Sequence, residues 1–378
     1  MKHEIAIIGG GPSGSSAAIY LAELGFDVCI IEKKLFPREI LCGEFLSREV
    51  VNNLRELNLF NQFLALKPNP IESLGIFYDN KKISAQLNFR AYGLKRSAFD
   101  NLLLMSAKER GAKVYQPCEV TEIIREDTGY KLYLRENAQE GKIINAKYVI
   151  AAYGKRNRLD AKLKRKFVSS KTNLDGIKYH VNKKYLKNIR DDQIQIYAAD
   201  GIYCGVNSVN EEEVTFCFLE NRTAISRTPV QSLKRLANIN NFFREVFKSE
   251  IEAAFMSNRI YGSGDVFFGK RNRVENGIFM VGDAAQVIAP LAGDGISMAM
   301  DSAKLLALLF NEKKTKNISD TDLYNLYDTE WQKKFNKRLR TALFIQQLLF
   351  YEAGRKIGLG SLHYFPRAIN YFIKNTRG

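Results

Sequence analysis

The amino-acid sequence predicts an α/β protein with a parallel sheet, a second, antiparallel sheet and a C-terminal helical segment. Three observations lead to this class. The chain starts with a short apolar run, a Gly-rich turn and a helical pattern; strand-like runs separated by Asn, Asp and Gly fill its middle; and apolar residues at helical spacing mark its end. With 378 residues, of which 46% are hydrophobic and 26% charged, the chain has a globular composition and is long enough for about two domains.

The first predicted element is a buried strand over residues 4–8. It is followed by GGGPSG at residues 9–14, which has the spacing G-x-G-x-x-G, and by a helix over residues 15–24. A second strand covers residues 27–31 and ends at Glu32. This order of strand, Gly-rich turn, helix and strand is typical of a Rossmann-type dinucleotide-binding unit.

Each residue type in this unit has a physical reason. Gly9 permits the tight turn, Gly11 lets a pyrophosphate approach the backbone, and Gly14 lets the helix pack closely on the strand. The N-terminus of the helix offers free N–H groups and the positive end of its dipole to phosphates. The Glu32 carboxylate can accept hydrogen bonds from ribose hydroxyls and would repel a 2′-phosphate. The unit therefore argues against NADP at this site but does not separate FAD from NAD.

A second Gly-rich region lies further along the chain. Residues 277–281 are an apolar strand, and GDAA at residues 282–285 and PLAGDGI at residues 290–296 lead from it into a helix over residues 297–310. The small residues leave room for a ligand at the end of the strand, and Asp283 can accept hydrogen bonds from the ribityl hydroxyls of a flavin. The glycines before the helix predict a second free helix N-terminus, which suits the electron-rich pyrimidine side of a reduced flavin.

Residues 34–47 (KLFPREILCGEFLS) and residues 96–103 (RSAFDNLL) complete an ordered set of four motifs. Together the four resemble FAD-dependent oxidoreductases of the p-hydroxybenzoate hydroxylase superfamily, and within it the geranylgeranyl reductase-like branch, which is related to the flavin-dependent halogenases. The resemblance extends from residue 4 to about residue 302 and implies a Rossmann-type FAD-binding domain below an antiparallel substrate sheet.

The resemblance also implies FAD as the cofactor. Because the chain has one dinucleotide motif, NAD(P)H or a separate reductase would serve as a transient electron donor. Catalytic residues remain unknown at this point. The residues that the resemblance implies in FAD binding are Gly9, Gly11, Pro12, Ser13, Gly14, Glu32, Lys33, Arg38, Cys42, Gly43, Glu44, Arg96, Gly154, Gly282, Asp283, Pro290, Gly293, Gly295 and Ile296.

The sequence departs from the family pattern in its middle. Tyr153 stands where the superfamily usually has an Asp. The Tyr-x-Trp-x-Phe-Pro motif of geranylgeranyl reductases is missing, and the nearest stretch is YCGVNS at residues 203–208. The Trp-x-Trp-x-Ile-Pro motif of tryptophan halogenases is also missing, since Trp331 is the only tryptophan. Neither polyprenyl reduction nor tryptophan halogenation therefore follows directly from the resemblance.

Four functions stay open. We expect first a monooxygenase that hydroxylates an organic biosynthetic intermediate, lipophilic or bound to a carrier. The alternatives are a C=C reductase of the geranylgeranyl reductase type, a flavin-dependent halogenase, and a flavin-bearing maturation or binding protein that acts on a partner chain. The oligomeric state is left open.

The small number of Cys and His residues argues against other chemistry. The five Cys are widely spaced without a CxxC pair, and there are three His, so we expect no metal site and reduced thiols in a cytoplasmic protein. A signal-peptide pattern and a long apolar run are both missing from the sequence. Peripheral contact with the inner membrane surface stays open.

The predicted domains are discontinuous in the sequence. We expect a helix over residues 230–248 in the substrate domain, starting after Pro229. The expected ranges are 1–70, 95–165 and 270–320 for the FAD-binding domain, 71–94 and 166–269 for the substrate domain, and 321–378 for the helical C-terminal segment.

The C-terminal segment combines an apolar stripe with basic residues. Its stripe has i+4 spacing, and a second short helix is expected from Pro366. The segment is interpreted either as a helix packed on the FAD-binding domain with a solvated basic face, or as a lid or membrane-surface contact. The residues of the stripe are Tyr327, Trp331, Phe335, Leu339 and Leu343.

The net charge of +16 comes from two segments. Residues 155–190 carry 13 Lys or Arg against two Asp, a net of +11, and residues 331–378 carry ten against one Glu, a net of +9. We expect no nucleic-acid partner because no recognition motif accompanies the charge. An anionic substrate, a carrier protein, an acidic membrane surface and a merely solvated basic surface remain as interpretations.

Overall fold

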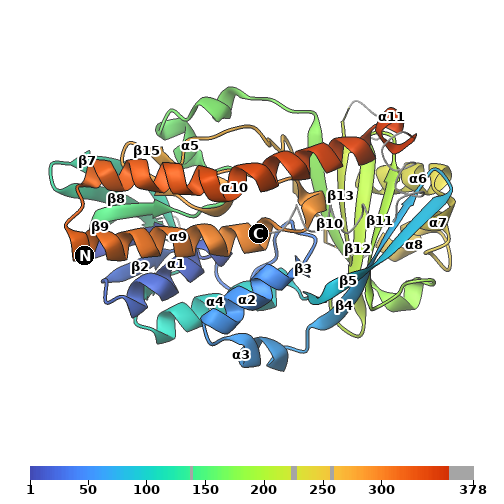
Figure 1. Cartoon of the computed structure of the whole chain (residues 1–378), viewed down its shortest axis with the longest axis horizontal. Coiled ribbons are helices and arrows are strands. Elements are labelled where there is room, and N and C mark those ends of the chain that lie inside the picture. The colour runs from blue at the N-terminus through green and yellow to red at the C-terminus, as the bar shows by residue number, and fades with distance from the viewer. Residues whose placement is uncertain (137–138, 223–227, 256–258, 357–378) are drawn as a thin grey trace.

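The computed structural model describes residues 1–136, 139–222, 228–255 and 259–356 (Figure 1). Two β-sheets lie next to each other along the long axis of the molecule, and a long C-terminal helix runs beside both of them. Among the helices that the structure describes, none combines the length and the apolar character needed to cross a membrane. The architecture is the predicted α/β class, with a parallel sheet, a largely antiparallel sheet and C-terminal helices.

The first sheet contains the Rossmann-type unit. Its strands are β1 (Lys2–Ile8), β2 (Val28–Ile31), β6 (Lys113–Tyr115), β7 (Cys118–Glu126), β8 (Gly129–Glu136), β9 (Gln139–Ala151), β15 (Val274–Glu275) and β16 (Ile278–Met280). β1 pairs in parallel with β2 and β9, and β6 and β16 extend the parallel part on either side. β8 pairs antiparallel with β7 on one side and with β9 on the other, and β15 pairs antiparallel with β16. All four residues of β2 are buried, as expected for a strand that is covered on both faces.

Helices cover this sheet. Helix α1 (Pro12–Glu23) begins with Pro12 at a position that needs no N–H donor, and the chain turns away at Gly25, whose φ is +79°. Helices α4 (Arg96–Glu109) and α9 (Gly295–Lys316) both pack against α1. Further α-helices are α2 (Arg48–Glu56), α3 (Phe60–Ala65), α5 (Arg158–Lys162) and α11 (Glu352–Gly354).

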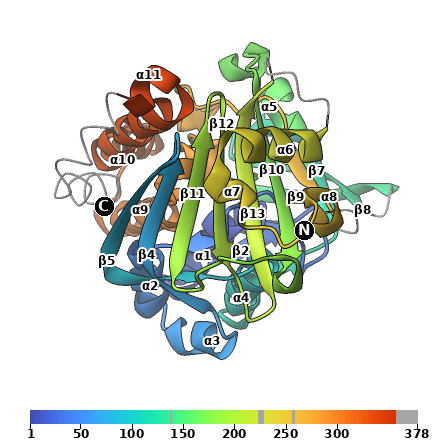
Figure 2. The same cartoon turned by 90° about the vertical axis from the view of Figure 1, so that its right-hand side faces the viewer.

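The second sheet forms the other half of the molecule (Figure 2). Its strands, in spatial order, are β14 (Tyr261–Ser263), β10 (Leu174–Asn182), β13 (Glu213–Asn221), β12 (Ile202–Ser208), β11 (Gln193–Ala199), β4 (Asn69–Tyr78), β5 (Lys81–Gly93) and β3 (Phe45–Leu46). All of its neighbouring strands are antiparallel except β11 and β4, which are parallel. Apart from the two-residue β3, its strands come from residues 69–93 and 174–263, so we propose that the domain boundaries lie near residues 70, 95, 165 and 270.

The two faces of the second sheet differ in their neighbours. Tyr179, Tyr197 and Phe216 point to the outer face, where they pack with Phe243 and with helices α6 (Pro229–Ile239), α7 (Asn241–Arg244) and α8 (Ile251–Phe255). Figure 2 shows these helices in front of the strands. Since side chains alternate along a strand, the neighbours of these residues point to the inner face, toward the first sheet.

The predicted single helix over residues 230–248 is wrong, because the structure has two helices separated at Asn240. The Asn240 side chain accepts a hydrogen bond from the backbone N–H of Phe243 and thereby caps α7. Its amide group donates to the carbonyls of Phe77 and Ala198, on β4 and β11. Asn240 is fully buried, so these hydrogen bonds turn the chain at this point and attach both helices to the sheet.

Helix α10 (Asp320–Phe350) extends along both sheets (Figure 1). The stripe from Tyr327 to Leu339 is buried as predicted, but Leu343 is 36% exposed. An i+4 stripe drifts by about 40° per step on a helix of 3.6 residues per turn, so a fifth member faces away from the core. Burial continues instead at Ala342 and Leu349. The helix predicted from Pro366 lies outside the described residues.

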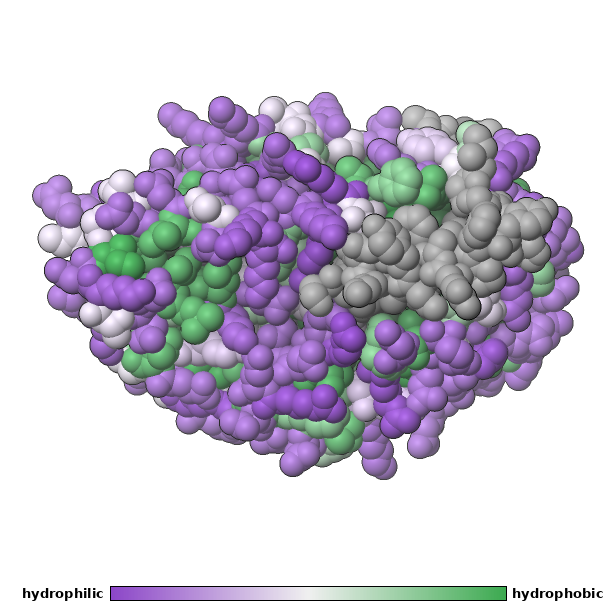
Figure 3. All heavy atoms as spheres, in the orientation of Figure 1, coloured by the Kyte–Doolittle hydropathy of each residue, from purple (hydrophilic) through white to green (hydrophobic). Residues whose placement is uncertain are grey.

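The outer side of α10 and α9 carries many polar groups. Figure 3 shows that hydrophilic side chains dominate the described part of this face, with smaller apolar patches between them. One interpretation of this segment gave its basic residues a solvated face. Arg338 is an exception, since it is only 4% exposed and points inward.

Replacing Asn240 with Ala should lower the free energy of unfolding by about 2–3 kcal/mol, because buried backbone partners on two strands and a helix lose their hydrogen bonds together. Urea unfolding followed by circular dichroism measures this. The matched control is Asn241→Ala at the neighbouring exposed residue, which should change stability by less than about 0.5 kcal/mol. Equal effects of the two substitutions would contradict the assigned role of Asn240.

Candidate functional site

A cavity of about 500 Å³ lies between the carboxyl ends of the parallel strands and the inner face of the second sheet. Parallel α/β sheets bind ligands at this edge, because helix N-termini and strand-end loops meet there. The cavity has a dinucleotide end, at the Gly-rich turn after β1, and a sheet end, at β11 to β13. Residues that line the sheet end are Leu41, Gly176, Ile194, Ile196, Tyr203, Gly205, Asn207, Cys217, Phe218, Leu219, Val266 and Leu291.

The dinucleotide end presents backbone groups rather than side chains. Helix α1 has Gly11 as its N-cap residue and no side-chain cap, so its N-terminal N–H groups face the cavity. A Cβ built on Gly11 would have a single neighbour within 4 Å, the Arg38 guanidinium at 3.6 Å. Gly154, whose φ is +86°, has no atom within 4 Å of such a Cβ. This open, uncapped helix end is suited to an anionic group such as a pyrophosphate.

Glu32 closes this end of the cavity at the end of β2. Its carboxylate is buried and accepts hydrogen bonds from the backbone N–H groups of Gly10 and Lys34, both at 2.8 Å. Arg38 Nε lies 3.9 Å from the same carboxylate. These contacts fix the carboxylate at the cavity wall, where the sequence predicts an acceptor for ribose hydroxyls.

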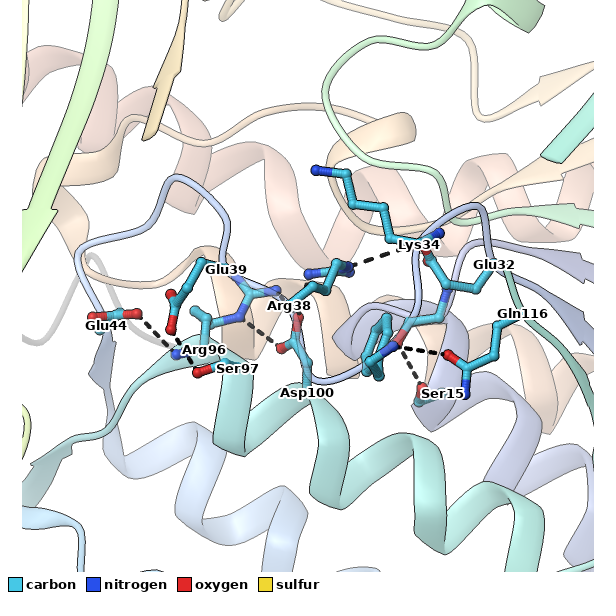
Figure 4. A network of polar contacts seen from close by, with 12 residues as sticks. Ser15, Glu32, Lys34, Arg38, Glu39, Glu44, Arg96, Ser97, Asp100 and Gln116 are labelled. Carbon is cyan, nitrogen blue, oxygen red and sulfur yellow. Dashed lines mark hydrogen bonds and ion pairs between the residues drawn. The ribbon is translucent and has the colours of Figure 1, made fainter. Parts of the chain in front are cut away.

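Two arginines along the cavity share one carboxylate, as Figure 4 shows. Asp100 is fully buried and accepts from Arg96 Nε and Nη2 at 2.7 and 2.8 Å and from Arg38 Nη1 at 3.1 Å. Burial lowers the pKa of Arg96, but the neighbouring Asp100 raises it more, so the guanidinium stays charged. The two arginines thus lie between the carboxylates of Asp100 and Glu32 along the wall that joins the two ends of the cavity.

Glu44 holds the loop before β3 against the second sheet. Its backbone is in the left-handed region at φ +58°, and its fully buried carboxylate contacts Lys178 Nζ at 2.9 Å, His180 Nε2 and Thr215 Oγ1. Burial by itself would raise the pKa of Glu44. The hydrogen bonds and charges of His180 and Lys178 lower it by more, so that the pKa falls to about 2. Glu44 is therefore an anion, and its carboxylate oxygens contact Lys178, His180 and Thr215 of the same chain.

A lysine already supplies the cation of this cluster. Among the described residues, Glu39, Glu44 and His180 form a group of side chains close enough to hold a metal ion. Lys178 is fully buried, and its ammonium lies 2.8 Å from Glu39 and 2.9 Å from Glu44. The Lys178 ammonium therefore offsets part of the negative charge of the two carboxylates.

The loop before α9 is fixed by the C-terminal helix. Gly293 has φ +63°, and a Cβ on it would lie 2.9 Å from the Phe45 ring. The buried Asp294 accepts from Arg338 Nε at 3.0 Å and from Ser297 Oγ at 2.5 Å. Because the Asp294 side chain is engaged by α10, it does not cap α9, and the N-terminus of α9 faces the cavity without a side-chain cap.

The sheet end of the cavity contains two cysteines. Cys42 lies in the loop before β3, and its Sγ accepts a hydrogen bond from the Glu44 N–H at 3.3 Å. Cys217 lies on β13, and burial raises the pKa of its thiol to about 12. Cys217 is therefore a neutral thiol at physiological pH.

Most of the residues that the resemblance implies do line this cavity. The two that do not are Gly14 and Gly282. A Cβ on Gly14 would lie 1.9 Å from the Gly9 carbonyl, and a Cβ on Gly282 would lie 2.7 Å from Ser13 Oγ, so both glycines serve close packing. For all of these residues, contact with a cofactor stays a prediction.

Several contacts that shape the site were not predicted from the sequence. Asp100 belongs to the motif at residues 96–103, but its ion pairs were not expected, although its i+4 spacing to Arg96 on one helix could have indicated one of them. Lys178 and His180 lie on one face of β10, but nothing in the sequence pairs them with Glu44. Arg338 lies 44 residues beyond Asp294 with no local signal.

Several known proteins are similar to this chain in sequence or in fold. The family model described as FAD binding domain matches residues 2–334. The digeranylgeranylglycerophospholipid reductase of Methanosarcina acetivorans is 26% identical over 358 residues, which cover 91% of this chain and 84% of that protein. Among solved structures, a myxobacterial chondrochloren halogenase has a TM-score of 0.80 at 19% identity and covers 98% of this chain and 90% of its own. A probable FAD-dependent monooxygenase from Pseudomonas aeruginosa has a TM-score of 0.74 at 14% identity, over 96% and 100% of the two chains.

Replacing Gly11 with Val should reduce the FAD content of the purified protein at least tenfold, because the new side chain fills the space at the N-terminus of α1. The folded chain has room for it, so the unfolding temperature of the flavin-free variant should match that of flavin-free wild type. Flavin absorbance per protein measures the FAD content. The control Ala22→Val, near the other end of the same helix, should keep its FAD; equal FAD in Gly11→Val would contradict the assigned pocket.

The Glu44 cluster should make stability depend on pH in the acid range. Because the pKa of Glu44 is lowered to about 2 in the folded state, the stabilisation is complete above the ordinary pKa of about 4.5 and is lost as the pH falls toward 2. Relative to Glu44→Gln, wild type should lose about 2 kcal/mol more of its free energy of unfolding between pH 6 and pH 3. Urea titrations at several pH values measure this. The exposed Glu72→Gln should follow wild type; a Glu44→Gln profile parallel to wild type would contradict the assignment.

Proposed function

Because the chain belongs to the FAD binding domain family, we propose that this FAD-dependent oxidoreductase is a monooxygenase that hydroxylates a largely apolar organic substrate. The observation that supports this proposal is the apolar lining of the sheet end of the cavity. Its walls are mainly apolar side chains such as Ile196 and Leu219, and it opens directly onto the dinucleotide end. A largely apolar space next to the cofactor is what oxygen transfer needs, since water would divert the reduced cofactor from the substrate.

We propose that FAD occupies the dinucleotide end. The uncapped N-terminus of α1 at Gly11 would hold the pyrophosphate, and Glu32 the ribose of the adenosine half. The shared Arg38 and Arg96 wall would lie along the cofactor toward the sheet end. When bound, FAD supplies the transfer of electrons between the donor, oxygen and substrate.

This chain's own residues would bind, orient and exclude water. The uncapped N-terminus of α9 would offer its N–H groups to the flavin ring, while Arg338 holds the Asp294 carboxylate by a hydrogen-bonded ion pair. In the net reaction, a substrate C–H becomes C–OH, one oxygen atom of O₂ goes to the product and the other to water, and two electrons come from NAD(P)H or a reductase. The donor would bind only transiently.

The second candidate is reduction of a C=C bond. The observation that favours it is the 26% identity, over most of both chains, to a named digeranylgeranylglycerophospholipid reductase. A reductase also needs a proton donor at the sheet end, where Tyr203 is a protonated phenol because burial raises its pKa.

Halogenation has less support from the geometry. A halogenase requires a lysine near the substrate. Lys33, Lys34 and Lys155 line the described cavity, but none of them comes from the strands of its sheet end. Lys178, on β10, is held by two carboxylates.

We propose a small-molecule substrate, free or attached to a carrier. Lys155 and Arg156 line the cavity and belong to the basic segment 155–190, so an anionic carrier or an anionic tail of the substrate would approach from this side. A cytoplasmic location, with or without contact to the inner membrane surface, is proposed with this substrate class.

The deciding experiment is product analysis with the FAD-loaded protein, NAD(P)H, and the metabolite that accumulates in a strain lacking this gene. Incorporation of ¹⁸O from ¹⁸O₂ into the product, with oxygen uptake that depends on the metabolite, is expected for a monooxygenase. If turnover occurs only without oxygen, and the product gains two hydrogens and no ¹⁸O, the protein is a reductase and not a monooxygenase. Conversion only of a protein-bound group on a partner chain would support the maturation function instead.

A further inference from the structure

Asp294 directly precedes helix α9 but does not cap it with its side chain. The residue is fully buried in the cavity wall. An acidic residue at this position usually accepts a hydrogen bond from the first turn of its helix, with its own backbone extended. The residues that cap α5, α6 and α10 in this way have ψ between 153° and 159°. Asp294 has a ψ of 5° and makes no cap hydrogen bond, so its carboxylate is directed elsewhere.

Arg338 of α10, the helix that lies beside α9 (Figure 1), holds this carboxylate. Its Nε, at 3.0 Å, and its Nη2 both donate to Asp294 Oδ2. Nη2 also donates to Ser297 Oγ at 3.0 Å, and Nη1 donates to Asp301 at 3.2 Å. The other carboxylate oxygen, Asp294 Oδ1, accepts from Ser297 Oγ at 2.5 Å and from Ser47 Oγ at 3.4 Å. The carboxylate is thus fixed on the side of α10.

The guanidinium of Arg338 stays charged in this buried place. Burial alone would lower the pKa of Arg338, but the carboxylates of Asp294 and Asp301 raise it by more. Hydrogen bonds between two charged groups are roughly twice as strong as those between neutral groups. The pair therefore competes well with the neutral N–H groups of α9 for the carboxylate.

The carboxylate and the N-terminus of α9 act on the same part of the cavity. The first N–H groups of α9 attract negative charge, since they form the positive end of the helix dipole. A carboxylate without a counter-charge at this place would repel negative charge, and a protein interior screens that repulsion less than water does. Pairing Asp294 with Arg338 therefore leaves the attraction of the helix end in place.

We propose that Arg338 is a positioning residue for the cofactor: it holds and pairs the Asp294 carboxylate, so that the N-terminus of α9 stabilises reduced FAD relative to oxidised FAD. Oxidised FAD takes up two electrons and one proton from the donor, so reduced FAD carries one more negative charge, on the pyrimidine side of its ring. The inference rests on the proposed function, because it requires FAD in this cavity. It does not depend on whether the reaction is hydroxylation or reduction.

The test measures the midpoint potential of FAD bound to the purified protein, by equilibration with redox dyes. Arg338→Met removes the cation and keeps an unbranched side chain. It should weaken the binding of reduced FAD relative to oxidised FAD about tenfold, which lowers the potential of this two-electron couple by about 30 mV. An unchanged potential, with or without a loss of stability, would give Arg338 a purely structural role and overturn the proposal.

Reciprocal variants separate charge from damage to the fold. Asp294→Asn removes the negative charge and should favour reduced FAD about tenfold. The double variant Arg338→Met/Asp294→Asn should return to within about threefold of wild type. If the double variant is shifted as far as Arg338→Met, the proposal fails. Should Arg338→Met not fold, Asp294→Asn decides alone, and the absence of a rise in potential overturns the proposal.

The same helix offers a matched control. Arg340 is exposed on α10, two residues beyond Arg338, and Arg340→Met removes an equal charge. It should change the ratio of the two FAD affinities less than twofold, because water and salt screen a charge at the surface. Equal shifts in Arg338→Met and Arg340→Met would indicate an effect of net charge and overturn the proposal.

The failure of this inference can be told from failure of the proposed function. Unchanged potentials in the variants, together with hydroxylation of a metabolite by wild type, would remove the role of Arg338 and leave the monooxygenase. Opposite shifts in Arg338→Met and Asp294→Asn that cancel in the double variant, without any oxygen transfer, would retain the role of Arg338 and remove the monooxygenase.

Discussion

The carboxylate of Glu44 joins parts of the chain that lie far apart in the sequence. It accepts from the backbone at the start of α4, from Lys178 and His180 on β10, and from Thr215 on β13. A fully buried charge is costly unless opposite charges and hydrogen bonds surround it, so these elements can be arranged in few other ways. The need to pair the buried Glu44 carboxylate therefore holds the second sheet over the dinucleotide end. The same pairing shapes the cavity between the second sheet and the dinucleotide end.

Helix α10 adds a second constraint from outside. Arg338 is nearly buried and pairs with Asp294 in the loop before α9 and with Asp301 about two turns further along α9. A cation from the C-terminal helix thus pairs with the acid that precedes α9 in the cavity wall. At its far end, the same helix places Phe350 against Tyr203. One helix therefore contacts the cavity wall both at the loop before α9 and at the second sheet.

The two ends of the cavity were predictable to different degrees. The Gly-rich turn, Glu32 and the loop around Gly293 could be expected at one site, because a backbone that a phosphate approaches closely permits few residue types at fixed spacing. These residues do line one cavity, and their contact with a cofactor stays a prediction. The sheet end has no such rule. Tyr203 and Asn207 depend on which face of β12 points inward and on what stands opposite, and both are set by sheet register.

The sequence by itself determined the fold class, the dinucleotide motif and the family, since each is carried by local patterns that repeat with the period of a strand or helix. It also located most of the basic charge in two segments. Only the tertiary structure decided the partners of the buried charges: Glu44 with Lys178, Asp100 with two arginines, and Asp294 with Arg338. The reason is physical, because an ion pair in a protein interior depends on distance and desolvation, and neither is encoded in the spacing of residues along the chain.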